Sequence, residues 1–139
     1  MNDWRMSNWK AHLLVCGLAL GLPGCVIVDD DGAPPALVGT VTVDWSIAGF
    51  QDPVDCVDFG VDRFELVIYD GPGDVVDEYE TYCEDFSLSV DLYEGYYFGD
   101  VTLIDPFDDA VTLTKEIDID IIGDTELEIP IDFPPSSFL

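Results

Sequence analysis

The sequence predicts an all-β protein: a single seven-stranded antiparallel β-sandwich that follows an N-terminal signal helix and an acidic tether. Three observations support this fold class. From residue 37 onward, apolar and polar residues alternate with a period of two, which is typical of half-buried strands. Turn residues separate these runs, and no amphipathic helical segment interrupts them. We therefore expect a signal peptide over residues 1–24, a tether over 25–36 and one sandwich domain over 37–139.

Seven segments have the alternation or the composition of strands: residues 40–47, 63–69, 75–83, 86–93, 96–104, 111–121 and 127–133. The third is largely polar and aromatic, as an edge strand is expected to be. In the sixth, Ile117, Ile119 and Ile121 alternate with acidic residues, which indicates one buried face and one charged face. Pro130 has no amide hydrogen to donate. We therefore expect the seventh strand at a sheet edge, or with the proline nitrogen facing away from the ladder.

The first 24 residues have the three parts of an export signal. Arg5 and Lys10 make a basic start, residues 11–22 are apolar, and a small-residue site follows. The apolar stretch of 12 residues is well short of the roughly 20 that a transmembrane helix needs. We therefore expect a signal peptide. The acidic run and the prolines after it are typical of an extended, solvated tether.

The apolar stretch ends in Leu22, Pro23, Gly24 and Cys25, which resembles the lipobox of bacterial lipoproteins. The resemblance implies that the Cys25 thiol carries a diacylglycerol group and that cleavage occurs just before it. Buried acyl chains, at about 0.8 kcal/mol per methylene, hold a protein firmly to a bilayer. Val26 follows the cysteine, which in diderm bacteria resembles cargo sent to the outer membrane. We therefore expect an exported, membrane-anchored protein, in the outer membrane if the source is a diderm bacterium.

A second pattern covers residues 92–97, which read Leu-Tyr-Glu-Gly-Tyr-Tyr. It resembles the Leu-any-Pro-Gly-any-Tyr corner of prealbumin-like sandwiches, a group that includes carboxypeptidase regulatory domains and the B-repeats of collagen adhesins. Glu94 stands where that pattern has proline. The resemblance implies a β-sandwich that serves as a stalk, a spacer or an adhesion module. The prediction of the fold depends on the period-two alternation and not on this resemblance.

The chain is strongly acidic, with 30 aspartates and glutamates, four lysines and arginines, and a net charge of −26. Asp3, Arg5 and Lys10 lie in the predicted signal peptide, and without them the net charge is −27. Such a surface repels nucleic acid and anionic headgroups, so neither is an expected direct partner. The candidate partners are a basic envelope protein, a glycan and cations.

The cysteines predict one disulfide. Cys16 lies in the signal peptide and Cys25 takes the lipid, which leaves Cys56 and Cys83. In an exported protein, an isolated pair most simply forms a disulfide. The alternative is a redox or metal pair. A redox motif has its cysteines about two residues apart, and the mature chain has no histidine to add as a metal ligand.

No catalytic residue is predicted. The only histidine, His12, lies in the signal peptide, so neither a Ser-His-Asp triad nor a Cys-His dyad can form in the mature chain. Carboxylates are so numerous that no particular pair is informative. No cofactor is predicted beyond weakly bound calcium, for which Asp105, Asp108 and Asp109 in one loop are the candidate ligands.

We expect a non-enzymatic, lipid-anchored sandwich with a structural or interaction role, displayed from the cell envelope. The candidates for an exposed aromatic interaction surface are Tyr79, Tyr82, Tyr93 and Tyr96. Two alternatives stay open. One is a calcium-assisted module for adhesion or for binding a glycan or a protein. The other is a hydrolase that uses two carboxylates, which predicts a deep pocket lined by acids.

Overall fold

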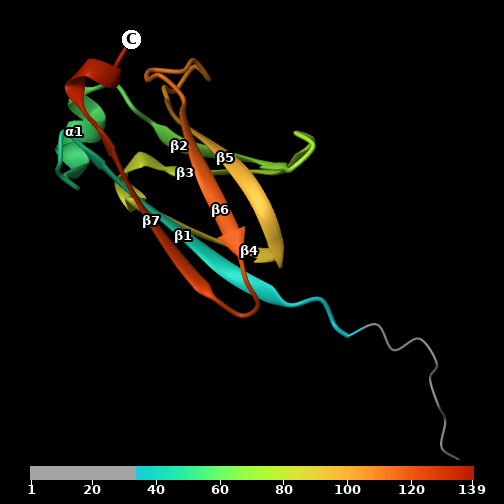
Figure 1. The fold of residues 1–139 in the computed structure, drawn as a ribbon. Coiled ribbons are helices and arrows are strands. Elements are labelled where there is room, and N and C mark those ends of the chain that lie inside the picture. Colours follow the sequence, from blue (N-terminus) through green and yellow to red (C-terminus); the bar gives the residue numbers. More distant parts are fainter. Residues whose placement is uncertain (1–33) are drawn as a thin grey trace, which may run out of the picture. The chain divides into compact units, whose positions relative to one another are not determined.

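Two β-sheets pack face to face in the computed structural model, which describes residues 34–139 (Figure 1). The predicted signal peptide, Cys25 and the first part of the tether lie outside the described residues. Residues 34–139 make one compact unit. In this unit, no helix has both the length and the apolar character needed to cross a bilayer.

One sheet has three strands in the order β4-β1-β7, and the other has four in the order β3-β2-β5-β6. The strands are β1 (Val38–Ile47), β2 (Arg63–Asp70), β3 (Val75–Tyr82), β4 (Ser87–Tyr93), β5 (Gly95–Ile104), β6 (Lys115–Ile121) and β7 (Glu126–Phe133). Within residues 34–139, three short helices accompany them: α1 (Pro53–Asp58), η1 (Cys83–Asp85) and η2 (Pro135–Ser137). The predicted all-β class and the two-sheet arrangement are confirmed.

The prediction that the sandwich is wholly antiparallel is wrong. β7 pairs with β1 in parallel, from Thr40 opposite Glu126 to Ile47 opposite Phe133, whereas the other four strand pairings are antiparallel. The reason is the route of the chain. After β6, residues 122–125 cross to the other sheet at the end where β1 begins. Alternation along a strand specifies the buried face but not the direction of the neighbouring strand.

The structure also contains a helix that we did not predict. α1 has only six residues, too few to show a helical period. Its start nevertheless carries a readable signal, because the Asp52 carboxylate accepts a hydrogen bond from the Val54 amide at 2.9 Å and Pro53 occupies the first turn.

The sixth strand begins later than predicted, at Lys115 and not at residue 111. Residues 111–113 pair instead with the end of the chain: the Leu113 amide donates to the Ser137 carbonyl at 2.8 Å, and the Leu139 amide donates to the Val111 carbonyl at 3.0 Å. This partner lies more than 20 positions away in the sequence, so local alternation could not reveal it.

The edge predictions are confirmed. β3 is an outer strand of its sheet, as its polar composition indicated. β7 is also an outer strand and pairs only with β1, where Pro130 lies opposite Asp44. An edge strand tolerates proline because one side of it needs no amide donor.

The two ends of the sandwich are built differently (Figure 1). Residues 34–37 lead into β1 at one end, beside the turns after β2 and β6. We call the opposite end the tip. It consists of residues 48–62, 82–86, 105–114 and 134–139, and so contains α1, η1 and η2.

Candidate functional site

The Cys56–Cys83 disulfide joins α1 to η1 at the tip. The Cα atoms are 6.0 Å apart and both cysteines are buried. The predicted pairing is therefore confirmed. The Trp45 indole Nε1 donates to the Cys83 carbonyl at 3.1 Å, which connects this end of the molecule to the core. Together, these contacts hold α1 against the sandwich.

Large apolar side chains are exposed at the tip although the core between the sheets is filled. The exposed fraction is 78% for Val57, 65% for Tyr82 and 82% for Phe107. The other exposed apolar residues of the tip are Phe50, Val54, Leu113 and Leu139. Of all these residues, only Tyr82 was among the predicted interaction residues. The sequence carries no signal for the rest, because a loop residue has no periodic pattern to show whether it is buried.

Two open concavities meet at Tyr82. One, of about 210 Å³, lies between α1 and η1 and is lined by Pro53, Cys56, Val57, Val61, Asp62, Tyr82, Cys83 and Glu84. The other, of about 260 Å³, is lined by Arg63, Glu80, Thr81 and Tyr82. Both are smaller than the roughly 300–1,000 Å³ of typical small-molecule sites.

A third concavity, of about 350 Å³, lies at the other end of the sandwich. It is lined by residues that precede β1 and by the end of β4 with the residue after it: Pro34, Pro35, Ala36, Leu37, Tyr93 and Glu94. This hollow is therefore formed between the end of the predicted tether and the corner that resembles prealbumin-like sandwiches.

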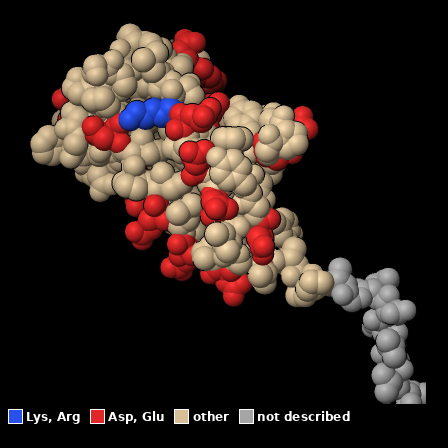
Figure 2. Space-filling view, viewed as in Figure 1, with Lys and Arg blue, Asp and Glu red and all other residues tan. Residues whose placement is uncertain are grey.

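Arg63 and Lys115, the two basic residues of the described part of the chain, are both engaged within the domain. Arg63 pairs with Asp62 at 3.3 Å, with Glu80 at 2.5 Å and with Asp108. These carboxylates raise the pKa of the guanidinium, chiefly through the hydrogen bonds to Asp108 and Glu80. On the face shown in Figure 2, basic atoms are seen only between acidic ones.

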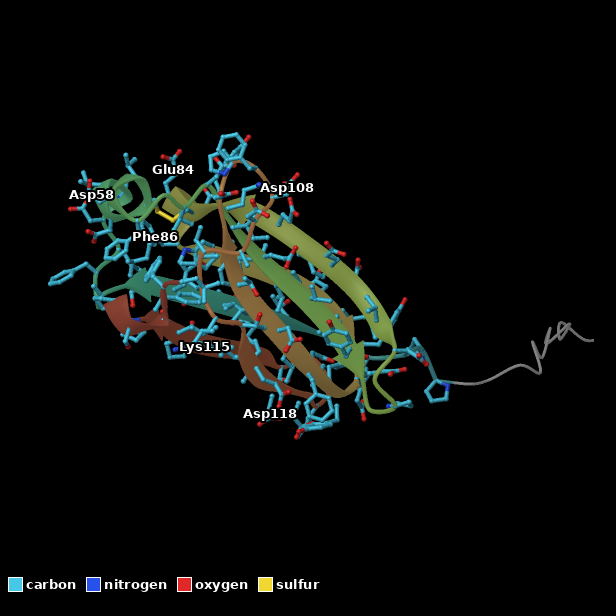
Figure 3. The ribbon with its side chains drawn as sticks, turned by 90° about the horizontal axis from the view of Figure 1, so that it is seen from above. Asp58, Glu84, Phe86, Asp108, Lys115 and Asp118 are labelled. Carbon is cyan, nitrogen blue, oxygen red and sulfur yellow. A yellow bond between two sulfur atoms is a disulfide. The ribbon has the colours of Figure 1, made fainter. Side chains whose placement is uncertain are left out.

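Lys115 is the first residue of β6 (Figure 3). Its Nζ donates to the Asp132 carbonyl oxygen and lies 5.6 Å from the centre of the Phe133 ring. These contacts link β6 to the end of β7 across the two sheets. The ammonium group thus helps to hold β6 of one sheet against β7 of the other.

The outer face of the four-stranded sheet brings like charges together. Glu65 on β2 lies directly opposite Glu80 on β3, and carboxylate oxygens of Glu65, Glu78 and Glu80 lie within 4.8 Å of one another. Like charges that face each other across strands destabilise the pair. Burial raises the pKa of the Glu65 carboxyl, and the charges of Glu78 and Glu80 raise it further. Sequence reasoning missed this cluster, because the register between β2 and β3 decides it.

The outer face of the three-stranded sheet is covered by hydroxyl and carboxyl groups. The Thr40 hydroxyl donates to Asp91 at 2.7 Å, and the Ser46 hydroxyl donates to Asp132 at 2.8 Å. Asp132 also accepts from the Gly49 amide at 2.7 Å. On this face, part of the acidic charge is therefore already used in cross-strand hydrogen bonds.

The structure does not bring the four predicted tyrosines together. Tyr79 packs beside the core, since it pairs with buried Leu66. Tyr82 lies at the tip, whereas Tyr93 and Tyr96 lie at the opposite end on different sheets. The Tyr96 hydroxyl donates to a carboxylate of β6 at 2.6 Å, and this hydrogen bond raises the pKa of Tyr96. Only Tyr82 belongs to the tip.

The three predicted calcium ligands lie in one loop, but other groups use two of their carboxylates. The Asp105 carboxylate accepts from the amides of Phe107 at 2.7 Å and Asp109 at 3.0 Å, which closes the loop. Asp108 pairs with Arg63. Calcium binding by Asp105, Asp108 and Asp109 stays a prediction.

No family model and no curated protein matches the chain. Solved structures resemble its fold. The TIE protein of Bacillus anthracis is 14% identical, with a TM-score of 0.51, over 70% of this chain and 17% of that chain. A leucine-rich repeat protein from Bacteroides thetaiotaomicron is 14% identical, with a TM-score of 0.45, over 70% of this chain and 12% of that one. A candidate polysaccharide-binding protein from the same bacterium is 12% identical, with a TM-score of 0.42, over 66% and 46% of the two chains.

The chain thus spans less than half the length of each of these proteins. At such low identity, the likeness to the TIE protein concerns the fold alone. The class of protein is that of a two-sheet β-sandwich.

Proposed function

We propose that the chain is a lipid-anchored β-sandwich of the cell envelope, with a non-enzymatic display role in which the domain binds a basic protein. Acyl chains on Cys25 fix the protein to the membrane, the outer membrane in a diderm cell. The acidic tether holds the domain away from the like-charged surface. The three-part export signal and the resemblance to the lipobox support the anchoring part of this proposal.

The binding part is carried by the distribution of charge. Residues 34–139 contain 26 acidic residues and two basic ones, a net charge of −24. Arg63 and Lys115 are both paired inside the domain. The surface of this part of the chain therefore offers many carboxylates and no unengaged cationic side chain. Complementary charge steers association and selects partners, so the favoured partner is a protein with a basic surface.

Anchoring is tested by expressing the full chain and its Cys25→Ser variant in a diderm bacterium. The measurements are membrane fractionation and mass spectrometry of the N-terminal peptide. We expect a processed, acylated Cys25 in the membrane fraction and no acylation of the variant. The Cys16→Ser variant is the matched control and retains processing. An uncleaved, unmodified chain in the cytosol, with Cys56 and Cys83 reduced, would contradict the proposal.

The cluster of Glu65, Glu78 and Glu80 favours a second candidate, calcium-assisted binding of a protein or glycan. A divalent cation with oxygen ligands would offset the repulsion among these carboxylates. Calorimetric titration of the full chain with calcium tests it. A saturable site that is lost in Glu65→Gln/Glu80→Gln would support this candidate. The matched control, Glu126→Gln/Glu128→Gln, removes equal charge from the other sheet. A defined site would be excluded if the heat of calcium binding does not saturate, or if the two double variants reduce this heat equally.

A further inference from the structure

The tip carries acidic residues and no basic ones. Its segments 48–62, 82–86 and 105–114 contain four, two and three acidic residues, nine in all, and its last segment, 134–139, contains none. No lysine, arginine or histidine occurs in these four segments. In the view of Figure 3, Asp58, Glu84 and Asp108 lie along the same edge of the molecule.

Among these carboxylates lies an apolar patch, which we define as Val57, Tyr82 and Phe107. Val57 and Tyr82 line the same concavity of about 210 Å³. Arg63 connects Tyr82 to the third member, because Arg63 lies opposite Tyr82 in the strand register and binds Asp108, the residue after Phe107. All three side chains are at least 65% exposed. An apolar centre with a polar rim is the usual anatomy of a protein interface.

The patch is also held in place by several contacts. The disulfide fixes α1 to η1, and the Val61 amide donates to the Cys56 carbonyl at 2.7 Å. The loop after β5 is closed by Asp105 and tied to β2 by the pair of Arg63 with Asp108. A surface ordered before binding loses less conformational entropy when a partner docks.

We propose that the tip is the surface that binds the basic partner. An arginine or lysine of the partner enters the concavity beside Tyr82, where it meets the carboxylate of Glu84 and the face of the aromatic ring, and Asp58 at the end of α1 adds to the acidic rim. Apolar side chains of the partner cover Val57 and Phe107. This proposal rests on the proposed function, since it takes a basic protein as the partner and assigns the place where that protein docks.

Charge decides among the candidate occupants of the patch. A second copy of this chain would bring its own nine acidic residues against the tip, and like charges at an interface oppose association. A cationic side chain gains ion pairs with the rim and a cation–π contact with Tyr82. The tip also lies at the end of the sandwich opposite residues 34–37, where the predicted tether ends.

The test uses the full chain in nanodiscs of zwitterionic lipid, with empty nanodiscs as the blank. The probe is a fluorescent peptide of alternating arginine and leucine, and the reference peptide has glutamate in place of arginine. Anisotropy gives the Kd. We expect Val57→Ser/Phe107→Ser and, separately, Asp58→Asn/Glu84→Gln to raise the Kd about tenfold.

Matched controls lie at the opposite end of the sandwich. Val75→Ser/Ile122→Ser removes two exposed apolar side chains there, and Glu94→Gln/Asp124→Asn removes two exposed charges. We expect both controls to leave the Kd within about twofold. Circular dichroism verifies that all four variants are folded, as expected for changes of exposed side chains.

The outcomes separate the two proposals. If tip variants and controls weaken binding equally, the peptide is held by diffuse charge, and the assignment of the tip is wrong while the basic partner stands. If the wild-type chain does not bind the cationic peptide, the proposed function itself fails. Tip-dependent self-association, measured by sedimentation and strengthened by Asp58→Asn/Glu84→Gln, would replace the basic partner with a second copy.

Discussion

The indole of Trp45 lies flat against the ring of Phe64, with the ring centres 4.0 Å apart and the planes 6° from parallel. Trp45 belongs to β1 in one sheet and Phe64 to β2 in the other, so this stack joins the two layers. Both side chains are buried, and the Trp45 Nε1 donates to the Cys83 carbonyl. The polar edge of the indole is thereby satisfied inside the core.

Truncation of this stack should be costly. We expect Phe64→Ala to lower the free energy of unfolding by about 3–5 kcal/mol, since it removes transfer energy and leaves a cavity. Urea denaturation followed by circular dichroism measures it. The control is Phe107→Ala, which removes the same ring from an 82% exposed position and should change stability by about 0.5 kcal/mol or less. Equal losses in the two variants would mean that the stack does not join the layers.

Loss of the disulfide should destabilise the tip and the fold together. Cys56 and Cys83 close a loop of 27 residues. In the chain-entropy model, such a bond contributes about 3–4 kcal/mol by restricting the unfolded chain. We expect Cys56→Ala/Cys83→Ala to show this loss in urea denaturation. Hydrogen exchange should also become faster in α1, and an unchanged exchange rate there would argue against the disulfide holding the helix.

Gly39 lies on β1, beside the segment that crosses between the sheets after β6, and there is no room for a side chain on it. A Cβ atom on Gly39 would lie 2.8 Å from a methyl carbon of Ile121 and 2.8 Å from the Thr125 carbonyl oxygen. Backbone cannot move aside cheaply, so we expect Gly39→Ala to cost about 1–3 kcal/mol. The matched control is Gly71→Ala, because nothing lies within 4 Å of the added carbon there. Thermal unfolding compares the two, and equal melting temperatures would contradict the close approach.

Glu65 should make stability depend on pH in a defined direction. Burial, followed by the charges of Glu78 and Glu80, raises its pKa in the folded state. The folded chain therefore binds more protons than the unfolded chain between the ordinary carboxyl pKa and the raised one. Stability contributed by Glu65 is then present at low pH and is lost as the pH rises through the folded pKa.

We accordingly expect Glu65→Gln to raise the melting temperature relative to wild type at neutral pH, and to lose this advantage in acid. Asp91→Asn on the other sheet is the control, since Asp91 accepts a hydrogen bond from Thr40 and should not show this gain. If Glu65→Gln leaves the melting temperature at neutral pH unchanged, solvent or bound cations relieve the repulsion among Glu65, Glu78 and Glu80.

Much of the fold follows from local patterns. Trp45 and its alternate neighbours on β1 were expected on one face, and they are buried. Polar β3 and proline-containing β7 were expected at edges, where they lie. Cys56 and Cys83 were expected to pair because they are the two cysteines left after Cys16 and Cys25, and the structure contains that disulfide. Each of these features depends on the residue type at one position or on a period within one strand.

Much less of the candidate site could be predicted from the sequence. Of the four predicted tyrosines, only Tyr82 lies at the tip, because strand register and chain direction separate the others. Val57 and Phe107 lie in a short helix and a loop, where no period marks exposure.

By itself, the sequence determined that this chain forms strands, which residues turn inward, which strands can be edges and which cysteines pair. These properties follow from the period-two geometry of a strand and from side-chain chemistry. Only the tertiary structure decided that β7 runs parallel to β1, that Glu65 faces Glu80, and that an apolar patch lies among the acids of the tip. The physical reason is that each depends on contacts between distant segments, which the route of the chain brings together.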